Sequence, residues 1–342
     1  MNNATTNQFS VVEQVPSRVA AAIIDQPGAS PRLGTVDLPA TTPGRSLLRV
    51  LAAPVNPLDL HIASGTFHSL RHDRAYVPGS ECIGVVMHSA RYEPGERVYA
   101  QCIATPDRPG SLATHVVVGD EDVVPVPGDV DAVTAAAVGN SGIAAYLPLI
   151  QTARLKAGDS VLILGATGTV GQLAVQIARS HQAARVVGVG RDTSALEQVL
   201  GLGADAVVEL RDNDTEDELA DRLLKATNGR VDVVLDGLYA LPLQAALRVC
   251  SPHGRVVNIG NAAGASAEIP AGLLRSRQLT VVGFAGLHVP MTIKEPALVW
   301  LWRQIAARKL HVPVERSSLV DIGRTWSLQE SSPHAKHVVF FA

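Results

Sequence analysis

A glycine-rich turn between a short apolar run and an amphipathic segment constrains the fold of this chain more than any other feature. The apolar run covers residues 160–164, which is long enough for a buried strand but too short for a helix. The turn that follows, residues 165–171, reads A-x-G-x-x-G from Ala166 to Gly171. After it, apolar residues recur at helical spacing, at Val170, Leu173, Ala174 and Ile177. Strand, glycine turn and helix in this order predict a dinucleotide-binding unit; the alternative is a tight turn that merely connects two elements.

The glycines of the turn have separate physical roles in such a unit. Gly168 allows the backbone to approach a pyrophosphate, and Gly171 allows the helix to pack closely on the strand. The helix N-terminus adds free N–H groups and the positive end of its dipole. We therefore expect the whole turn to bind the cofactor, through Gly165, Ala166, Thr167, Gly168, Thr169, Val170 and Gly171.

The tip of the second strand in such a unit selects between the two nicotinamide cofactors. Residues 185–189 form the expected strand and lead into Gly190, Arg191 and Asp192. An acidic residue at this tip favours NAD, whereas a basic residue accommodates the 2′-phosphate of NADP. Gly190 leaves room there, and the guanidinium of Arg191 can form forked hydrogen bonds to a phosphate, so the sequence favours NADPH. The alternative is that Arg191 points into solvent while Asp192 caps the next helix.

The pattern along all 342 residues indicates two domains. Residues 18 to about 127 contain short β-branched runs separated by Pro-Gly turns, which is typical of a β-barrel or sandwich. From about residue 131, apolar strands alternate with helical segments, which predicts a doubly wound parallel sheet in an α/β fold. The strands expected in that sheet are residues 160–164, 185–189, 206–209, 231–235, 255–259 and 279–284. The helices expected after the glycine turn are residues 192–202, 215–226, 241–249 and 295–309, and a last strand covers residues 337–341. Residues 1–17 are expected to be a loose polar tail.

Composition excludes several functional classes. Lys and Arg total 29 against 32 for Asp and Glu, so the net charge of −3 provides no basic footprint for nucleic acid or an anionic membrane. The cysteines, Cys82, Cys102 and Cys250, form neither a disulfide framework nor a CxxC zinc pattern. No signal-peptide profile is present, and no apolar run approaches the roughly 20 residues of a membrane span. We expect a soluble, cytoplasmic protein with a small-molecule substrate.

Short motifs elsewhere in the chain carry a family resemblance. They are residues 55–59 (VNPLD), 77–84 (VPGSECIG), 94–98 (PGERV), 201–205 (GLGAD), 231–236 (VDVVLD), 254–257 (GRVV) and 332–336 (SPHAK). In this order, and with the glycine turn, the chain resembles the medium-chain dehydrogenase/reductase superfamily, and most closely its zinc-independent, quinone oxidoreductase-like branch. The resemblance implies a GroES-like, β-rich catalytic domain of residues 18–135 and 287–342. It also implies a Rossmann domain of residues 136–286 inserted within it.

The chain departs from the zinc alcohol dehydrogenases of that superfamily at their metal ligands. Asn56 and Ser80 stand where those enzymes have a Cys and a His, and residues 139–141 stand in the region of the third ligand. Amide and hydroxyl oxygens are poor zinc ligands compared with thiolate and imidazole. A different set could only be drawn from scattered residues without metal-ligand spacing, namely His61, His68, Cys82, Cys102 and His115. The sequence therefore predicts no metal.

Without a Lewis acid, the substrate itself must spread the charge that hydride transfer creates. A conjugated enone or a quinone does so, because the charge collects on an enolate or phenolate oxygen. The leading hypothesis is an NADPH-dependent reductase of such substrates. The alternatives are a carbonyl reductase or alcohol dehydrogenase of the same fold, and a non-catalytic NADPH-binding protein.

The resemblance also suggests which residues form the site. It places Asn56 near the nicotinamide ribose and the substrate, and makes Asn56, Ser80 and Tyr99 the catalytic candidates. Asp59 and Glu81 are expected to brace the cleft. Further cofactor contacts are expected from the segment before the glycine turn and from the ends of the last parallel strands, at Asn140, Ser141, Ile259, Gly260, Phe284 and Ala285.

The proton donor is left open by the sequence. Some enoyl reductases of the superfamily have a Tyr a few residues beyond the Asn-Pro-x-Asp motif, where this chain has Phe67, which cannot donate. His61, His68, Tyr99 and bulk water remain as candidates. A homodimer is also predicted, because residues 279–284 resemble an apolar edge strand that a second subunit would cover.

Overall fold

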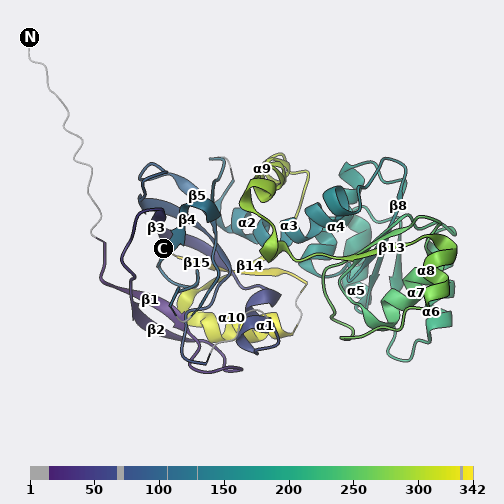
Figure 1. Ribbon diagram of the computed structural model, residues 1–342, viewed down its shortest axis with the longest axis horizontal. Helices are drawn as coiled ribbons and strands as arrows, with labels where there is room; N and C mark the ends of the chain where they lie inside the picture. Colours follow the sequence, from purple (N-terminus) through teal and green to yellow (C-terminus); the bar gives the residue numbers. More distant parts are fainter. Residues whose placement is uncertain (1–14, 68–72, 106, 129, 332–333, 342) are drawn as a thin grey trace, which may run out of the picture.

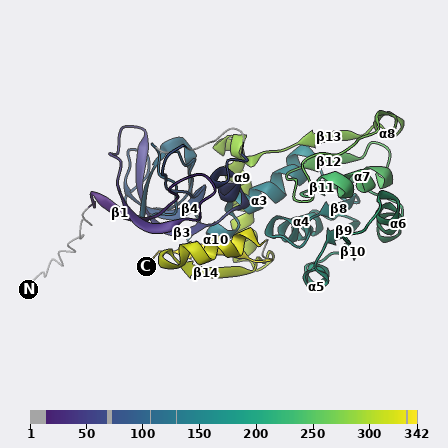
Figure 2. The same cartoon turned by 90° about the horizontal axis from the view of Figure 1, so that it is seen from below.

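Two lobes form the structure, a computed structural model that describes residues 15–67, 73–105, 107–128, 130–331 and 334–341. One lobe is β-rich and contains both ends of the described chain, whereas the other is built on a parallel sheet from the middle of the sequence (Figure 1). In the views of Figures 1 and 2, helix α3 (Gly139–Leu147) lies between the two sheets. The α/β fold with a β-rich and a doubly wound parallel-sheet part is confirmed.

The β-rich lobe is centred on its longest strand, β3. Its main sheet has the order β14-β15-β3-β4-β5-β7, with β6 also paired to β3, and β1 and β2 form a separate antiparallel hairpin. Because β15 pairs antiparallel with β3, Val338 lies opposite Pro54, and the C-terminal strand starts beside the end of the first long strand. The strands are β1 (Arg18–Ile23), β2 (Arg32–Asp37), β3 (Arg45–Pro54), β4 (Glu81–His88), β5 (Arg97–Gln101), β6 (His115–Gly119), β7 (Val123–Pro125), β14 (Val314–Ser318) and β15 (Lys336–Phe340).

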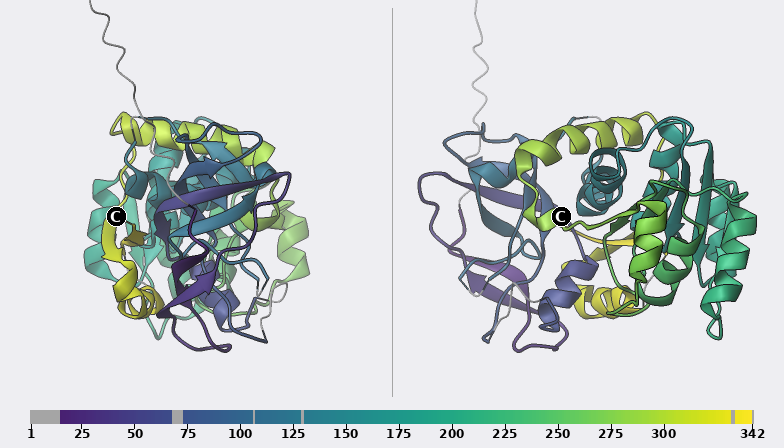
Figure 3. Two further views of the ribbon diagram at one scale, coloured as in Figure 1. Left: turned by 90° about the vertical axis from the view of Figure 1, so that its left-hand side faces the viewer. Right: turned by 45° about the vertical axis from the view of Figure 1, so that its right-hand side comes forward.

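Helices close this lobe and join it to the other. Helix α1 begins directly after β3: Asn56 is its extended N-cap, and Pro57 occupies the first helical position, where a missing N–H costs nothing. The indole N–H of Trp302 on α9 donates to the carbonyl oxygen of Ala135 on α2 over 3.2 Å. Helix α9, the yellow-green helix at the top of Figure 3, also packs against α3. The helices are α1 (Pro57–Ala63), α2 (Ala132–Ala137), α9 (Met291–Ala306) and α10 (Ile322–Glu330), with 3₁₀ turns at Asp120–Asp122, Gly286–His288 and Leu319–Asp321.

The second lobe is a parallel sheet of six strands in the order β10-β9-β8-β11-β12-β13. All of its pairings are parallel, so every strand ends at the same edge. The strands are β8 (Ser160–Leu164), β9 (Arg185–Gly190), β10 (Ala206–Glu209), β11 (Val233–Asp236), β12 (Arg255–Asn258) and β13 (Thr280–Gly283). The connecting helices are α4 (Thr169–Ser180), α5 (Thr193–Gly201), α6 (Glu216–Ala226), α7 (Ala240–Val249) and α8 (Ala271–Arg277), and α3 continues into a π-helical turn at Pro148–Thr152.

The central strand β8 explains why helices cover both faces of this sheet. Ile163 packs into one apolar cluster together with Ala174 of α4, whereas Leu162 packs into another together with Leu219 of α6 and Leu243 of α7. All five residues of β8 are buried. A strand that is apolar on both sides must be sandwiched, and right-handed crossovers then place α4 and α6–α7 on opposite faces.

The structure agrees with most of the expected elements and adds several that the pattern missed. The expected strand at residues 160–164 coincides with β8, and the last of the expected helices runs over Met291–Ala306 instead of residues 295–309. The missed elements are short or have no regular apolar period: β2, β7, α1, α3, α8, β14 and α10. No helix in the described part of the chain combines the length and the hydropathy that crossing a bilayer requires.

Candidate active site

A cluster of buried polar side chains lies where β3, β4, α3 and β15 begin or end in the β-rich lobe. We call it the polar cluster. Each member is at most 5 % exposed, although three of the six carry an ionisable group. Its members are Asn56, Asp59, Ser80, Glu81, Ser141 and Lys336.

The side-chain amide of Asn56 is at the centre of the polar cluster. Its Nδ2 donates to Ser80 Oγ over 3.1 Å and to Glu81 Oε1 over 2.9 Å. Its Oδ1 accepts a hydrogen bond from the ammonium group of Lys336. Both amide hydrogens of Asn56 are therefore engaged inside the protein.

Lys336 connects the C-terminal strand to the start of α3. Besides Asn56, its Nζ donates to Ser141 Oγ over 3.0 Å. Burial lowers the pKa of this lysine, and the neighbouring carboxyl groups of Glu81 and Asp59 oppose that shift. The sequence predictions did not include Lys336 as a site residue. The available signal was a lysine at the first position of the terminal strand, which ends in the apolar residues Val338, Val339 and Phe340.

Glu81 joins the polar cluster to the backbone of α3. Its Oε2 accepts a hydrogen bond from the backbone N–H of Asn140 over 2.6 Å. This approach requires glycine at position 139, because a Cβ there would lie 2.2 Å from the same oxygen. The hydroxyl of Tyr99 on β5 also donates to Glu81. Thus Tyr99 lies beside the polar cluster, with its proton committed to a carboxylate.

Burial shifts the pKa of each acid in this region upward. The pKa of Asp59 rises to about 7, mainly because burial penalises its charge, while hydrogen bonds from the Asn56 backbone and the Ser80 hydroxyl oppose that rise. Burial likewise raises the pKa of Glu81 and raises that of Tyr99 well above its ordinary value. The polar cluster therefore combines one ammonium with two carboxyl groups whose charges are costly to bury.

These residues do not fit a zinc ion. The oxygens that converge here belong to one amide, to hydroxyls and to the carboxyl groups of Asp59 and Glu81, and the cation among them is the ammonium of Lys336. A second cation beside it would be repelled, and the thiolate and imidazole ligands that zinc prefers are missing from the polar cluster. Among the described residues, no group of three or more His, Cys, Asp or Glu side chains is arranged to hold a metal. His68, one of the alternative ligands considered above, lies outside the described residues.

The glycine turn lies between β8 and α4, at the edge where the parallel strands end. Gly168 is the N-cap of α4, and no side chain caps this helix end. A Cβ at position 171 would lie 2.3 Å from the carbonyl oxygen of Gly165, so only glycine permits this packing. A Cβ at position 168 would meet nothing closer than 3.8 Å. The turn is therefore tightly packed beneath Gly171 and open above Gly168, as an anion-binding helix N-terminus requires.

The tip of β9 borders the glycine turn. A Cβ at Gly190 would lie 2.6 Å from Thr167 Cγ2, so glycine lets the two segments touch. Asp192 accepts from the backbone N–H of Ala195 over 2.8 Å, which confirms that it caps α5. Arg191 is exposed and bonds to none of the described residues, so its guanidinium is available to a ligand.

The loops after the last two strands reach the same edge. Ile259 and Gly260 follow β12, where Asn258 Nδ2 donates to Asp236 Oδ2 over 2.8 Å and to the Gly260 carbonyl oxygen over 2.7 Å. Phe284 and Ala285 follow β13, and the backbone N–H of Phe284 donates to Asn258 over 2.8 Å. The Asp236–Asn258 pair was not predicted: Asp236 ends the VDVVLD motif, but the motif does not indicate that its carboxylate meets Asn258.

Helix α3 connects this edge to the polar cluster. A Cβ at Gly286, just after β13, would lie 3.6 Å from Asn140 Oδ1, so the start of α3 borders the loop after β13. On its other side the same helix start contacts Glu81 and Lys336. The structure therefore brings the predicted catalytic residues Asn56, Ser80 and Tyr99 into one region, and α3 links that region to the edge that carries the predicted cofactor contacts.

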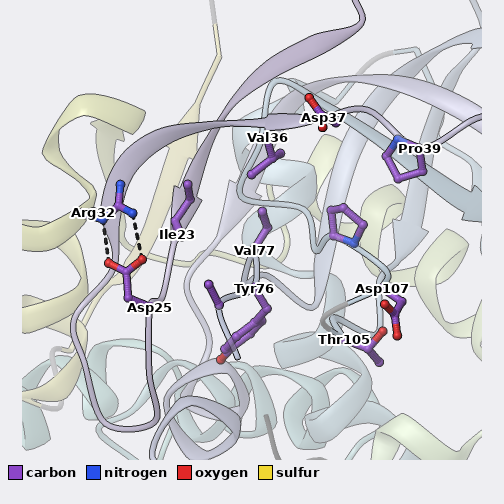
Figure 4. Close-up of a pocket in the computed structure, with 12 residues that line it drawn as sticks. Ile23, Asp25, Arg32, Val36, Asp37, Pro39, Tyr76, Val77, Thr105 and Asp107 are labelled. Carbon is purple, nitrogen blue, oxygen red and sulfur yellow. Dashed lines mark hydrogen bonds and ion pairs between the residues drawn. The ribbon is translucent and has the colours of Figure 1, made fainter. Parts of the chain in front are cut away.

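A separate hollow of about 360 Å³ lies outside this region, between the β1–β2 hairpin and the loops around Val77 and Thr105 (Figure 4). Its acidic residues are paired with arginines: Asp25 accepts from Arg32 over 2.6 and 2.8 Å, and Asp107 accepts from Arg74. None of the polar-cluster residues lines it. We do not assign the chemistry to this hollow, because its charged groups already neutralise one another.

Two family descriptions match the chain. Residues 42–128 match the alcohol dehydrogenase GroES-like domain, and residues 169–303 match the zinc-binding dehydrogenase family. The first therefore covers most of the β-rich lobe, and the second starts at α4 and covers much of the parallel sheet.

Known proteins are similar to this chain over most of its length. It is 32 % identical over 335 residues to a phenolphthiocerol/phthiocerol polyketide synthase polypeptide of Mycobacterium tuberculosis, a match that covers 94 % of this chain but only 15 % of that much longer protein. It is 32 % identical over 231 residues to a quinone oxidoreductase from Lama guanicoe, covering 66 % of this chain and 67 % of the relative. A solved mycobacterial structure complexed with NADPH superposes with a TM-score of 0.81 at 23 % identity, covering 94 % of this chain and all of the other.

Proposed function

Because the chain belongs to the medium-chain dehydrogenase/reductase superfamily, in its quinone oxidoreductase-like branch, we propose that it is an NADPH-dependent reductase of quinones or conjugated C=C bonds. The chain is thus an oxidoreductase, and the proposal concerns its cofactor and its acceptor. The observation that carries the choice of acceptor is the polar cluster, in which the ammonium of Lys336 is bonded to Asn56 and Ser141.

NADPH fits the open edge of the parallel sheet. The uncapped N-terminus of α4 and the free space above Gly168 suit the pyrophosphate, and the unpaired guanidinium of Arg191 suits the 2′-phosphate. Asn140, Ser141, Ile259, Gly260, Phe284 and Ala285 border the same edge and would contact the nicotinamide half. NADPH supplies a hydride when bound. A mycobacterial structural neighbour is complexed with the same cofactor.

The polar cluster favours an acceptor that delocalises charge. In this superfamily the oxygen of a simple ketone is generally polarised by zinc, and the residues here do not fit that metal. An enone or a quinone moves the incoming charge onto a conjugated oxygen, which hydrogen-bond donors alone can stabilise. Within this proposal, Asn56, Ser80 and Tyr99 hold the geometry of the site, because each already donates to Ser80, Glu81 or Asp59.

A turnover assay tests the proposed function. NADPH oxidation would be followed with a panel of quinones, enones, aldehydes and ketones, with EDTA present and then with added Zn²⁺. We expect turnover of quinones or enones that EDTA does not change, and a preference for NADPH over NADH that is lost in Arg191→Ala. Turnover of aldehydes or ketones alone, or activity that appears only with Zn²⁺, would instead identify a metal-dependent carbonyl reductase. Tight NADPH binding without turnover of any acceptor would identify a non-catalytic binding protein.

We also propose a homodimer formed along β13. All four residues of this edge strand are exposed, and Val281 and Val282 are 36 % and 37 % exposed. The adjacent helix α8 has no buried residue. An apolar edge strand of this kind is normally covered. Light scattering should give twice the mass of the chain at micromolar concentration, and a monomer would contradict the proposal.

The domain boundaries proposed from the sequence, residues 18–135 with 287–342 and residues 136–286, remain our proposal for the two domains. The cytoplasmic location also stays a prediction.

A further inference from the structure

The polar cluster contains one hydroxyl proton that the described protein does not use. Asn56 donates both amide hydrogens, to Ser80 and Glu81. The Ser80 hydroxyl donates to Asp59, and the Tyr99 hydroxyl donates to Glu81. Ser141 instead accepts, from Lys336 over 3.0 Å, and within the described residues its own hydroxyl proton has no acceptor.

The position of Ser141 indicates which ligand this free hydroxyl proton could reach. It lies in the first turn of α3, whose start contacts Glu81 on one side and the loop after β13 on the other. The carboxyl ends of the parallel strands, where ligands bind in open α/β sheets, meet at that loop. Ser141 therefore stands between the buried ammonium of Lys336 and the edge that would bind the nicotinamide.

We propose that Ser141 is the catalytic acid of the reductase, donating its hydroxyl proton to the substrate oxygen while the ammonium of Lys336 replaces it. This inference rests on the proposed function, since it needs an acceptor that gains a hydride. Lys336, which need not touch the substrate, is a positioning residue and the proton source. In this arrangement an internal cation takes over the polarising role of a metal.

Atoms and charge balance when the acceptor is an enone. Hydride addition at the β-carbon breaks the C=C π bond, whose electron pair forms a new C=C bond between the α-carbon and the carbonyl carbon. The π pair of the carbonyl group moves onto its oxygen. The Ser141 O–H bond breaks toward that oxygen, and one N–H proton of Lys336 moves to Ser141 Oγ. The substrate has then gained a hydride and a proton and is released as an enol, which tautomerises. Lys336 is left as a neutral amine and recovers its proton from water.

The surroundings of Lys336 support the release of a proton. Burial lowers the pKa of the ammonium, so the neutral amine is more accessible than in a solvent-exposed lysine. At the same time the neighbouring carboxyl groups of Glu81 and Asp59 oppose that lowering of the pKa and favour the ammonium form. The two effects together suit a group that donates a proton and regains it.

The test compares two acceptor classes in Ser141 variants. Hydride addition to a quinone leaves a phenolate-type oxygen, whose conjugate acid has a pKa near 10, as in tyrosine, and which can leave unprotonated. An enolate is far more basic and needs an acid. We therefore expect Ser141→Ala to lower kcat for an enone by about 10²–10⁴-fold, the usual size of general acid catalysis, and to lower kcat for a benzoquinone less than about tenfold. Ser141→Thr, which keeps a hydroxyl, should recover most of the enone activity.

The controls separate catalysis from structure. Ser180→Ala removes a hydroxyl that bonds within its own helix, at the far end of α4, and should change neither rate. Lys336→Arg keeps the charge but holds its proton more firmly, so it should lose enone turnover selectively. An equal loss on both acceptors in Ser141→Ala would show a structural role and overturn the inference. Unchanged enone turnover in Ser141→Ala would overturn it as well.

A binding measurement distinguishes failure of this inference from failure of the proposed function. 4-Nitrophenolate, whose absorbance reports a hydrogen bond to its oxygen, would be titrated into the protein with NADP⁺ present. We expect a spectral shift in the wild type and at least tenfold weaker binding in Ser141→Ala, whether or not any acceptor is turned over. Equal binding to both proteins, or no binding, would contradict the role of Ser141 even if the enzyme reduces quinones.

Discussion

The glycine turn and the polar cluster differ in how they use their hydrogen-bonding groups. At the turn, the N-terminus of α4 has no side-chain cap, and the space above Gly168 is empty. In the polar cluster, Asn56 and Ser80 bond to protein groups, and even the ammonium of Lys336 bonds to two neighbours. The glycine turn therefore leaves its donors free for an external anion, whereas the polar cluster holds the buried ammonium of Lys336 with groups of the protein itself.

Within the proposed function, this difference would account for reduction without a metal. An open helix end loses little when it is empty, because water solvates its N–H groups. A buried ammonium must instead be surrounded by acceptors and counter-charges, since an unpaired ion in the interior is very costly. The polar cluster therefore behaves as part of the core, and its members should depend on one another far more than the residues of the turn do.

The largest effect is expected from removing the internal cation. Lys336→Met leaves the carboxyl groups of Glu81 and Asp59 buried without their ammonium, so the free energy of unfolding should fall by about 3–5 kcal/mol, as for other broken buried pairs. Adding Glu81→Gln should restore part of this loss. Chemical denaturation of the two single variants and the double variant gives the coupling energy between the two residues. Additive losses would show that the two charges do not stabilise each other.

The distance along the sequence between interacting residues explains why the glycine turn could be predicted and the role of Lys336 could not. The turn is local: strand β8, the three glycines and α4 lie within 21 residues, 160–180, so one window of sequence contains the whole argument. The polar cluster joins Asn56 to Lys336, which are 280 positions apart and meet only because β15 pairs with β3. Asn56 and Ser80 could be identified by motif, but that their donors are already committed is a property of the folded chain.

A second effect concerns the closest packing in the glycine turn. In Gly171→Ala the added methyl would lie 2.3 Å from Gly165 O and 2.5 Å from the Cα of Ala166, both of them backbone atoms that cannot rotate away. We expect the free energy of unfolding to fall by about 3 kcal/mol or more. Gly201→Ala is the matched control, because nothing lies within 4 Å of its added Cβ at the end of α5. Thermal unfolding of both variants checks the contrast, and equal melting temperatures would contradict the packing argument.

A third prediction concerns Asp59, whose titration should make the free energy of unfolding depend on pH. Burial raises its pKa from 3.8 to about 7, so the folded state holds this proton more tightly than the unfolded chain does. The contribution of the protonated Asp59 carboxyl to the free energy of unfolding is therefore complete below about pH 4. It is lost progressively as the pH rises to about 7. Asn cannot ionise, so the free energy of unfolding of Asp59→Asn relative to the wild type should increase by about 2 kcal/mol between pH 5 and pH 7. Denaturation curves at several pH values measure this difference, and a constant difference would show that Asp59 is ionised throughout.

The smallest effect should come from the open side of the glycine turn, and it concerns binding instead of folding. In Gly168→Ala the new methyl meets no atom within 3.8 Å, and the backbone angles at this position, φ −76° and ψ 164°, suit alanine, so stability should change by less than about 0.5 kcal/mol. The methyl would instead occupy the space that a pyrophosphate needs, which should weaken the binding of NADPH and of NADH alike by about tenfold, or about 1.4 kcal/mol. Calorimetric titration with both cofactors measures this, and Arg191→Ala provides the contrast, because its effect should fall on NADPH alone. If Gly168→Ala destabilises the protein as much as Gly171→Ala does, the turn is tightly packed on both sides. The glycine turn would then have no open side for an anion, and the contrast with the polar cluster would be wrong.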